Sequence, residues 1–179
     1  MKRMIKIAGL ALAIAFSTAT AQAQDIKPYA GVGLGYFAFD VGLGYGTMST
    51  IGYFGQIGAD FGDYFGAELR AGATQEADKT VGGINLKLKL SSFISYLGKL
   101  QYPVSDQLKI YALAGGTTAK ATATASVPSL AASASTTTTA GSFGGGVSFN
   151  ANDNIRVGAE WMRYASDTSA FSGTIQYSF

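Results

Sequence analysis

The chain has 179 residues, with 13 Lys+Arg against 11 Asp+Glu and neither histidine nor cysteine. Without these two residue types it has no disulfide, no thiol nucleophile and none of the imidazoles that usually serve as general base or zinc ligand. We therefore expect a protein that is not an enzyme and that has no cofactor and no metal site.

The first 23 residues have the three parts of a secretory signal peptide. A basic start is followed by an apolar run at residues 7–16 and by small residues that end at Ala23. Ten apolar residues are too few to cross a bilayer as a helix, which needs about 20. We expect export and cleavage after Ala23, which leaves one domain at residues 24–179. That domain has ten bases and eleven acids with no basic stripe, so nucleic acid is not an expected partner.

The composition after the signal favours strands over helices. The whole chain has 24 glycines, 11 phenylalanines and 10 tyrosines, while only 13% of its residues are charged. No later apolar run is long enough for a spanning helix. Many glycines and aromatic rings with few charges are typical of alternating β-strands.

Eight segments alternate between apolar and polar or small residues, the period-two pattern of a strand with two different faces. The first three cover residues 29–39, 51–61 and 65–73. In the second segment, Gln56 and Asp60 lie on the polar face. These segments predict strands that each have one oily and one polar side.

The fourth segment, residues 84–102, is the longest. Its even positions are mostly apolar and its odd positions include several lysines, so a single alternation runs through about 19 residues. A transmembrane strand needs only about 9 to 11 residues. We therefore expect this strand to extend beyond a bilayer.

The last four segments alternate in the same way and cover residues 110–127, 143–149, 155–161 and 171–179. In the fifth segment the pattern assigns Tyr111 and Leu113 to the apolar face. Alternating alanine and threonine then lead to a turn at Pro128-Ser129. Residues 119–140 are thus either a hairpin that rises above the membrane or a flexible polar loop.

Short turns and longer connections alternate between these segments, as in an up-and-down antiparallel sheet. An open sheet would leave an apolar face and two unpaired edges exposed, and in lipid every backbone group must be paired. The sequence predicts an all-β fold, an eight-stranded antiparallel up-and-down transmembrane β-barrel with its apolar face outward. The alternative is a soluble lipocalin-like barrel with that face inward. Rings expected at the two membrane interfaces are Tyr29, Phe61, Tyr64, Tyr102, Tyr111 and Phe179.

The last strand carries the most specific family feature, because Phe171, Ile175, Tyr177 and the terminal Phe179 alternate along it. The chain resembles the small eight-stranded outer-membrane barrels of Gram-negative bacteria, which include OmpX/Ail-like and OmpA-like barrels, here without a peptidoglycan-binding domain. The resemblance implies that this strand is the signal read by the barrel-insertion machinery. It also implies outer-membrane lipid as the surroundings.

Five charged residues are expected inside the barrel: Glu68, Arg70, Lys99, Arg156 and Glu160. Charges held away from water need partners, so a layer of ion pairs that fills the lumen is the favoured interpretation. A gated pore that uses the same charges is the alternative, although an eight-stranded barrel has room only for side chains.

These features predict a non-catalytic integral protein of the cell outer membrane. Its role would be structural support of the envelope or adhesin-like interaction with a surface protein or host partner through the outer loops. A narrow channel for small solutes is the alternative function. A lipid-modifying enzyme is a remote one, because such barrels rely on histidine as general base.

Overall fold

The computed structural model describes most of the chain beyond the predicted signal peptide, namely residues 26–40, 46–81, 84–127, 130–164 and 167–179. The predicted signal peptide and the predicted turn at Pro128-Ser129 lie outside the described residues. The described part forms nine strands: β1 (Ile26–Asp40), β2 (Thr47–Phe61), β3 (Phe65–Thr74), β4 (Ala77–Val81), β5 (Ile84–Pro103), β6 (Leu108–Val127), β7 (Leu130–Asn150), β8 (Ile155–Tyr164) and β9 (Thr168–Ser178). It contains no helix that is long and apolar enough to cross a membrane.

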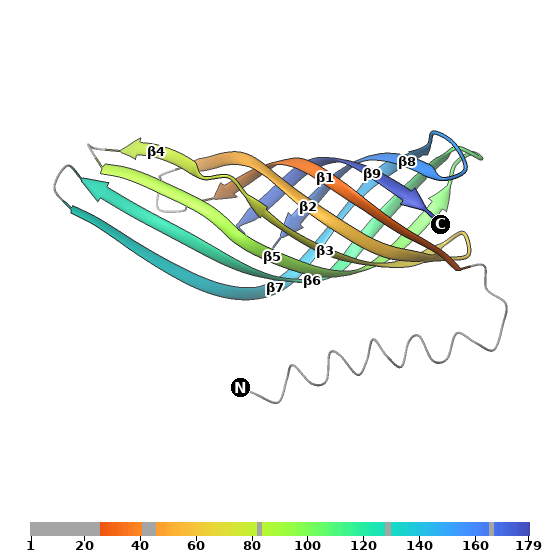
Figure 1. Cartoon of the computed structure of the whole chain (residues 1–179), viewed down its shortest axis with the longest axis horizontal. Helices are drawn as coiled ribbons and strands as arrows, with labels where there is room; N and C mark the ends of the chain where they lie inside the picture. The colour runs from red at the N-terminus through yellow and green to blue at the C-terminus, as the bar shows by residue number, and fades with distance from the viewer. Residues whose placement is uncertain (1–25, 41–45, 82–83, 128–129, 165–166) are drawn as a thin grey trace, which may run out of the picture.

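Eight of these strands form a closed antiparallel barrel, as the sequence predicts. Each strand pairs with its neighbour in sequence around the ring, β1 pairs with β9, and β3 pairs with β5. The ninth strand, β4, pairs only with the far part of β5, where Ala77 lies opposite Leu88. Sequence analysis missed this strand inside what it treated as a loop (Figure 1).

The two ends of the barrel differ in their connections. At one end, which we call the turn end, short turns join β2 to β3, β5 to β6 and β7 to β8, and the C-terminus lies beside them. The first of these turns contains Gly62 with a φ of 66°, a conformation that glycine adopts at little cost. At the opposite end, the hairpin end, β6 and β7 extend beyond the rest of the barrel (Figure 1).

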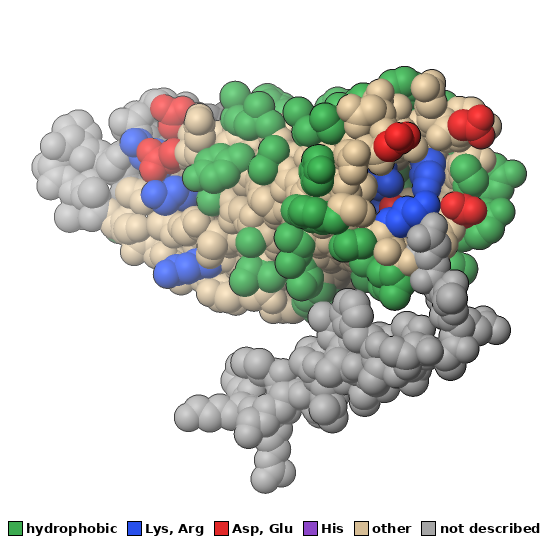
Figure 2. Space-filling model, turned by 45° about the vertical axis from the view of Figure 1, so that its right-hand side comes forward, with side chains coloured by type: hydrophobic (Ala, Val, Ile, Leu, Met, Phe, Trp, Pro, Cys, Tyr) green, Lys and Arg blue, Asp and Glu red, His purple; other side chains and the backbone are tan. Residues whose placement is uncertain are grey.

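The outer wall of the barrel is apolar. On β1, Val32, Leu34 and Tyr36 are 63%, 62% and 59% exposed, while the residues between them point inward. One of these is Gly33, where an added Cβ would collide with the ring of Phe54 from the neighbouring strand. Figure 2 shows hydrophobic side chains spread over the middle of the barrel. A continuous apolar surface of this kind is stable in lipid rather than in water.

A β-bulge interrupts the long alternation of β5, so the prediction of one parity throughout residues 84–102 is wrong. Leu90 lies opposite Ala121 and Ser92 lies opposite Lys120, which leaves Ser91 without a partner in the β5–β6 register. One extra residue reverses the faces of the strand. Leu90 therefore belongs to the buried cluster inside the barrel, although it has the same parity as the outward-facing Ile94.

The face assignment of β6 is also reversed. Leu113 is 2% exposed and lies inside, and Tyr111 points into the lumen, whereas Ile110 is exposed on the outer wall. The predicted interfacial ring Tyr29 likewise lies inside and is 2% exposed. All three inward residues are large and apolar or amphipathic, so composition alone did not separate them from lipid-facing residues.

Beyond the barrel, β4, β5, β6 and β7 continue as a protruding sheet at the hairpin end (Figure 1). The predicted hairpin is confirmed, because β6 and β7 pair along their whole length as far as Val127 and Leu130. β8 ends at Tyr164, which lies opposite Ser142 of β7. Among the residues that the structure describes, the part of β7 from residue 130 to residue 141 therefore has a partner strand on one side only.

Candidate functional site

The centre of the lumen is occupied by an arginine that two carboxylates hold. Arg70 forms ion pairs through Nε with Glu68 and through Nη1 with Glu160, and its Nη2 donates to Glu160 Oε2 at 2.8 Å. Nη1 also donates to the hydroxyl of Tyr164 at 3.3 Å. The side chains of Arg70 and both glutamates are no more than 2% exposed. A guanidinium with five donors in a fixed fork suits two carboxylates at once.

A second ionic group lies nearer the turn end and is centred on Asp60. Lys99 Nζ is 2.5 Å from Asp60 Oδ1, and Arg156 Nη1 is 3.0 Å from Asp60 Oδ2. Arg156 also donates from Nε to the side chain of Asn150 at 3.1 Å. Both cations therefore share one buried carboxylate.

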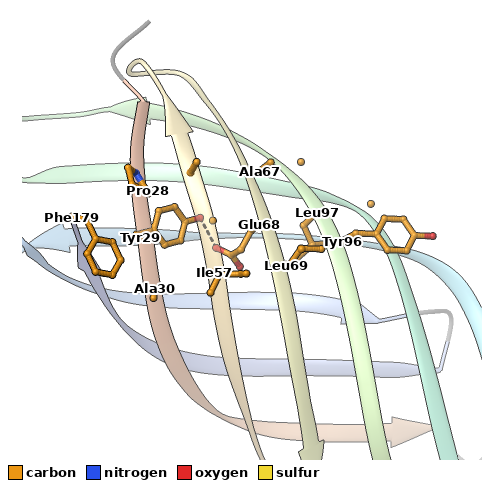
Figure 3. Close-up of a pocket in the computed structure, with 14 residues that line it drawn as sticks. Pro28, Tyr29, Ala30, Ile57, Ala67, Glu68, Leu69, Tyr96, Leu97 and Phe179 are labelled. Atoms are coloured by element: carbon orange, nitrogen blue, oxygen red, sulfur yellow. Dashed lines mark hydrogen bonds between the residues drawn. The ribbon is translucent and has the colours of Figure 1, made fainter. Parts of the chain in front are cut away.

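Tyr29 joins the two groups. Lys99 Nζ donates to the hydroxyl of Tyr29 at 3.0 Å, and this hydroxyl donates to Glu68 Oε2 at 2.7 Å. Figure 3 shows the ring of Tyr29 pointing toward Glu68, with this hydrogen bond as a dashed line. The five predicted charges thus lie inside the barrel in two linked groups rather than in one layer.

The network has three acids and three bases, so it is neutral as a whole. Two further hydroxyls complete the shell around Glu160, from Tyr111 at 3.0 Å and from Ser172 at 3.3 Å. Sequence analysis placed Asp60 on the polar face but did not include it in the cluster. The five selected residues carry one surplus positive charge, and that imbalance was the signal for a missing carboxylate.

Above the ionic network, toward the hairpin end, the lumen is filled by aromatic rings. Phe93 lies at the centre of this aromatic cluster, with its ring centroid 5.9 Å from Phe37, 6.4 Å from Phe54 and 5.5 Å from Tyr164. Arg70 meets the cluster from below, with its guanidinium carbon 4.9 Å from the centroid of Phe54. The lumen is therefore ionic in one half and aromatic in the other.

Hollows lie at both ends of the lumen and on the outer wall of the described structure. One of about 220 Å³ lies at the hairpin end over Leu90, Phe93 and Tyr164, and one of about 600 Å³ lies at the turn end beside Arg156. No residue lines both of them. A third hollow of about 750 Å³ lies on the outer wall, with Phe179 and Tyr96 among its lining residues (Figure 3). Its lining is mostly apolar, and the hydroxyl of Tyr29 and the carboxylate of Glu68, which are among the lining groups, are already hydrogen-bonded to each other.

The predicted insertion residues all lie on the outer wall. Phe171, Ile175, Tyr177 and Phe179 are 63%, 58%, 50% and 74% exposed. The backbone amide of Phe179 donates to the carbonyl of Pro28 at 3.0 Å, so the end of the chain is tied to the first strand. Recognition of this strand by the insertion machinery remains a prediction.

The charged side chains of the ionic network are held by one another rather than offered to a ligand. Within the described residues, no group of three or more His, Cys, Asp or Glu side chains is arranged to hold a metal ion. Each carboxylate of the network already accepts from a cation. The arrangement can therefore close the lumen, but it contains no activated nucleophile or poised acid-base pair.

The protruding sheet carries its own charged groups. Lys87 Nζ is 2.7 Å from Glu76 Oε1, and both side chains are exposed. Through this hydrogen bond Lys87 lowers the pKa of Glu76, and Glu76 raises the pKa of Lys87. On the same sheet, hydroxyls bond across strands, as between Ser91 and Thr122 at 2.8 Å.

The closed ring, its apolar wall and its filled lumen agree with the sequence family that the chain matches. The model of the outer membrane protein beta-barrel domain matches residues 8–179. The chain belongs to this family. Its short turns therefore lie on the periplasmic side, and its hairpin end is extracellular.

Solved structures with the same fold have low sequence identity to the chain. The N-terminal β-barrel domain of Pseudomonas aeruginosa OprF is 16% identical, with a TM-score of 0.57, and 88% of this chain and 100% of that chain are covered. Neisserial surface protein A is 12% identical, with a TM-score of 0.55 over 86% and 97%. Ail of Yersinia pestis, in complex with the heparin analogue sucrose octasulfate, is 17% identical, with a TM-score of 0.54 over 86% and 97%. No curated protein matches the chain in sequence.

Proposed function

We propose that the protein is a non-catalytic outer-membrane barrel that presents its protruding sheet as a docking edge for an extended segment of a partner protein at the cell surface. The unpaired edge of β7, residues 130–141, carries this proposal. An edge of this kind is a template for strand addition. Residues 131–141 contain no charge, no proline and no interruption of the β6–β7 register. By contrast, β4 covers the other edge of the protruding sheet.

The lumen supports this role better than it supports transport. The ionic network and the aromatic cluster occupy its centre, and Arg70, Glu160 and Phe93 are each 2% exposed. An eight-stranded barrel whose interior is filled by side chains leaves no aqueous path. The barrel is then a rigid support in the envelope, and interaction takes place outside it. Ail, a protein of the same fold, was solved with a polyanionic ligand, which supports an outward-facing role.

A matched pair of variants tests the docking edge. Ser135→Lys with Thr137→Lys places two charges on the open strand β7, while Thr118→Lys with Thr124→Lys places two charges on the same face of the central strand β6. Bacteria that display each form are compared for adhesion to cultured epithelial cells. We expect the edge variant to lose at least tenfold in bound cells and the β6 variant to bind as the unmodified protein does, because lysine on an edge hinders strand addition.

Planar bilayers test the alternative function directly. We expect the purified barrel to give no reproducible single-channel steps. Steps that vanish when Arg70 or Arg156 is replaced would establish the channel. If bacteria with the two lysine variants adhered equally well, the proposal that β7 is a docking edge would be wrong.

A further inference from the structure

The β-bulge of β5 assembles a cluster of polar groups on the outer face of the protruding sheet. Leu88 and Leu90 pack against the aromatic cluster, so Lys89 between them faces outward. On β6, Ala119 and Ala121 pack inward and Lys120 between them faces outward. Lys89 lies opposite Thr122 and Ser92 lies opposite Lys120, so the two lysines approach the bulge from both sides.

Two hydroxyls lie between these lysines. Ser91 is the residue that the register omits, and its hydroxyl is 2.8 Å from that of Thr122. The hydroxyl of Thr122 is in turn hydrogen-bonded to the hydroxyl of Ser135 of β7 at 3.0 Å, which fixes the orientation of these side chains. A bulge commonly redirects a side chain in this way. Two ammonium groups that flank two hydroxyls form a donor set that suits an oxyanion.

The acids of the described residues cancel the charge at this position only in part, since Glu76 interacts electrostatically with Lys89 as well as with Lys87. The acids on this face, Glu76 and Asp78, lie on the β4 side, where Glu76 pairs with Lys87. Neither Lys89 nor Lys120 has a carboxylate oxygen within 4.0 Å in the part of the chain that the structure describes. Figure 2 shows both basic and acidic side chains beyond the hydrophobic band at the hairpin end, and Lys87, Lys89 and Lys120 outnumber the two acids Glu76 and Asp78 there. The site therefore attracts anions.

The height of the site above the membrane indicates where the anion comes from. Ile94 is the last large apolar residue of β5 on the outer wall and is 58% exposed. Ser91 is three residues further out, which is about 10 Å along a strand and about 8 Å along the membrane normal for a strand tilted by about 40°. The polar layer of a bilayer leaflet is about 5 to 8 Å thick. The bulge thus lies level with headgroups rather than far out in solvent.

We propose that Lys89, Ser91, Lys120 and Thr122 form a site for a phosphate group on the saccharide headgroup of an outer-leaflet glycolipid. Rows of hydroxyl groups cross the strands of the protruding sheet next to this site. They can hydrogen-bond to the sugar that carries the phosphate. The site lies on a face of the sheet, whereas the docking edge is the open side of β7. It is therefore independent of the proposed partner strand and rests only on the orientation of the barrel.

The test measures binding of lipopolysaccharide to the full mature barrel in phosphatidylcholine nanodiscs, by titration at constant ionic strength. Lys89→Ala with Lys120→Ala is compared with Lys27→Ala with Lys109→Ala, which removes two charges at the turn end. Each lysine near an anionic surface contributes about a fivefold factor in affinity, so we expect a loss of about 25-fold for the first variant. The turn-end variant should bind as the unmodified protein does, and Lys89→Arg with Lys120→Arg should retain binding.

Two further probes identify the source and the chemistry of the ligand. Dephosphorylated lipopolysaccharide should bind the unmodified protein as weakly as intact lipopolysaccharide binds the alanine variant. Inorganic phosphate and heparin are titrated as soluble anions. Unchanged affinity of the alanine variant, equal binding of the dephosphorylated lipid, or binding of soluble anions without binding of lipopolysaccharide would each overturn the proposal. Heat-modifiable migration on a gel verifies that every variant is folded.

Discussion

The two halves of the lumen are filled by opposite chemistries on the same strands. Toward the periplasm, six charged side chains neutralise one another around Arg70 and Asp60. Toward the cell surface, aromatic rings pack around Phe93. The ionic half depends on complete pairing, because an unpaired buried charge is costly. The aromatic half depends on volume, because a gap there loses only packing and apolar burial. Conservative substitutions should therefore act differently in the two halves.

The largest effect is expected from Arg70→Met. This change leaves Glu68 and Glu160 buried without their shared cation, and loss of one partner of a buried pair costs about 3 to 5 kcal/mol. Urea unfolding in detergent micelles measures the loss, with the exposed Lys120→Met as control. Arg70→Lys should recover only part of the stability, because an ammonium cannot reproduce the forked contacts. Full recovery by lysine would show that charge alone, without geometry, sustains this half.

A somewhat smaller effect is expected from Phe93→Ala in the aromatic half. Removal of this ring leaves a cavity among Phe37, Phe54 and Tyr164, which we expect to cost about 3 kcal/mol. Phe93→Leu should cost less than about 1.5 kcal/mol, because most of the volume is kept. The same unfolding assay compares the two variants. If leucine proves as harmful as alanine, this half depends on ring geometry as strictly as the other depends on charge geometry.

The smallest of the three effects concerns the link within the ionic half. Tyr29→Phe removes the hydroxyl that accepts from Lys99 and donates to Glu68. Hydrogen bonds to charged groups contribute about 2 kcal/mol each, but water at the vacated position can replace part of this, so a net loss of about 2 kcal/mol is expected. Tyr36→Phe on the lipid-facing wall is the control and should change stability by less than about 0.5 kcal/mol. Equal effects of both changes would mean that the two ionic groups are stable without their connection.

The sequence predicted the fold because its information is repeated along the chain. Each segment alternates, short and long connections take turns, and only a closed ring in lipid pairs every backbone group. The five charges selected for the lumen all lie there because acidic and basic side chains are not found on a lipid-facing wall without cost. Asp60 was missing from the set because the charges of the selected residues were not required to sum to zero.

Local details escaped prediction for a different reason. Alternation gives the relative faces of residues within a strand but not which face is inward when both carry large residues, as at Tyr111 and Leu113. A single extra residue at Ser91 reverses the faces without any mark in composition. The strand β4 was missed because five residues are too few to display a period. These errors arise where pairing with a neighbouring strand, rather than the strand's own sequence, decides the outcome.

The pairing of β1 with β9 has a consequence for how the molecule is made. Tyr29 lies opposite Ser178, so the first strand has no second neighbour until nearly the whole polypeptide has been synthesised. Contacts between residues so distant in sequence are slow to form, and the intermediate that precedes them has two exposed edges. Such an intermediate must be shielded from aggregation while it travels to its membrane. Assembly therefore has to follow synthesis rather than accompany it, whatever the protein later binds.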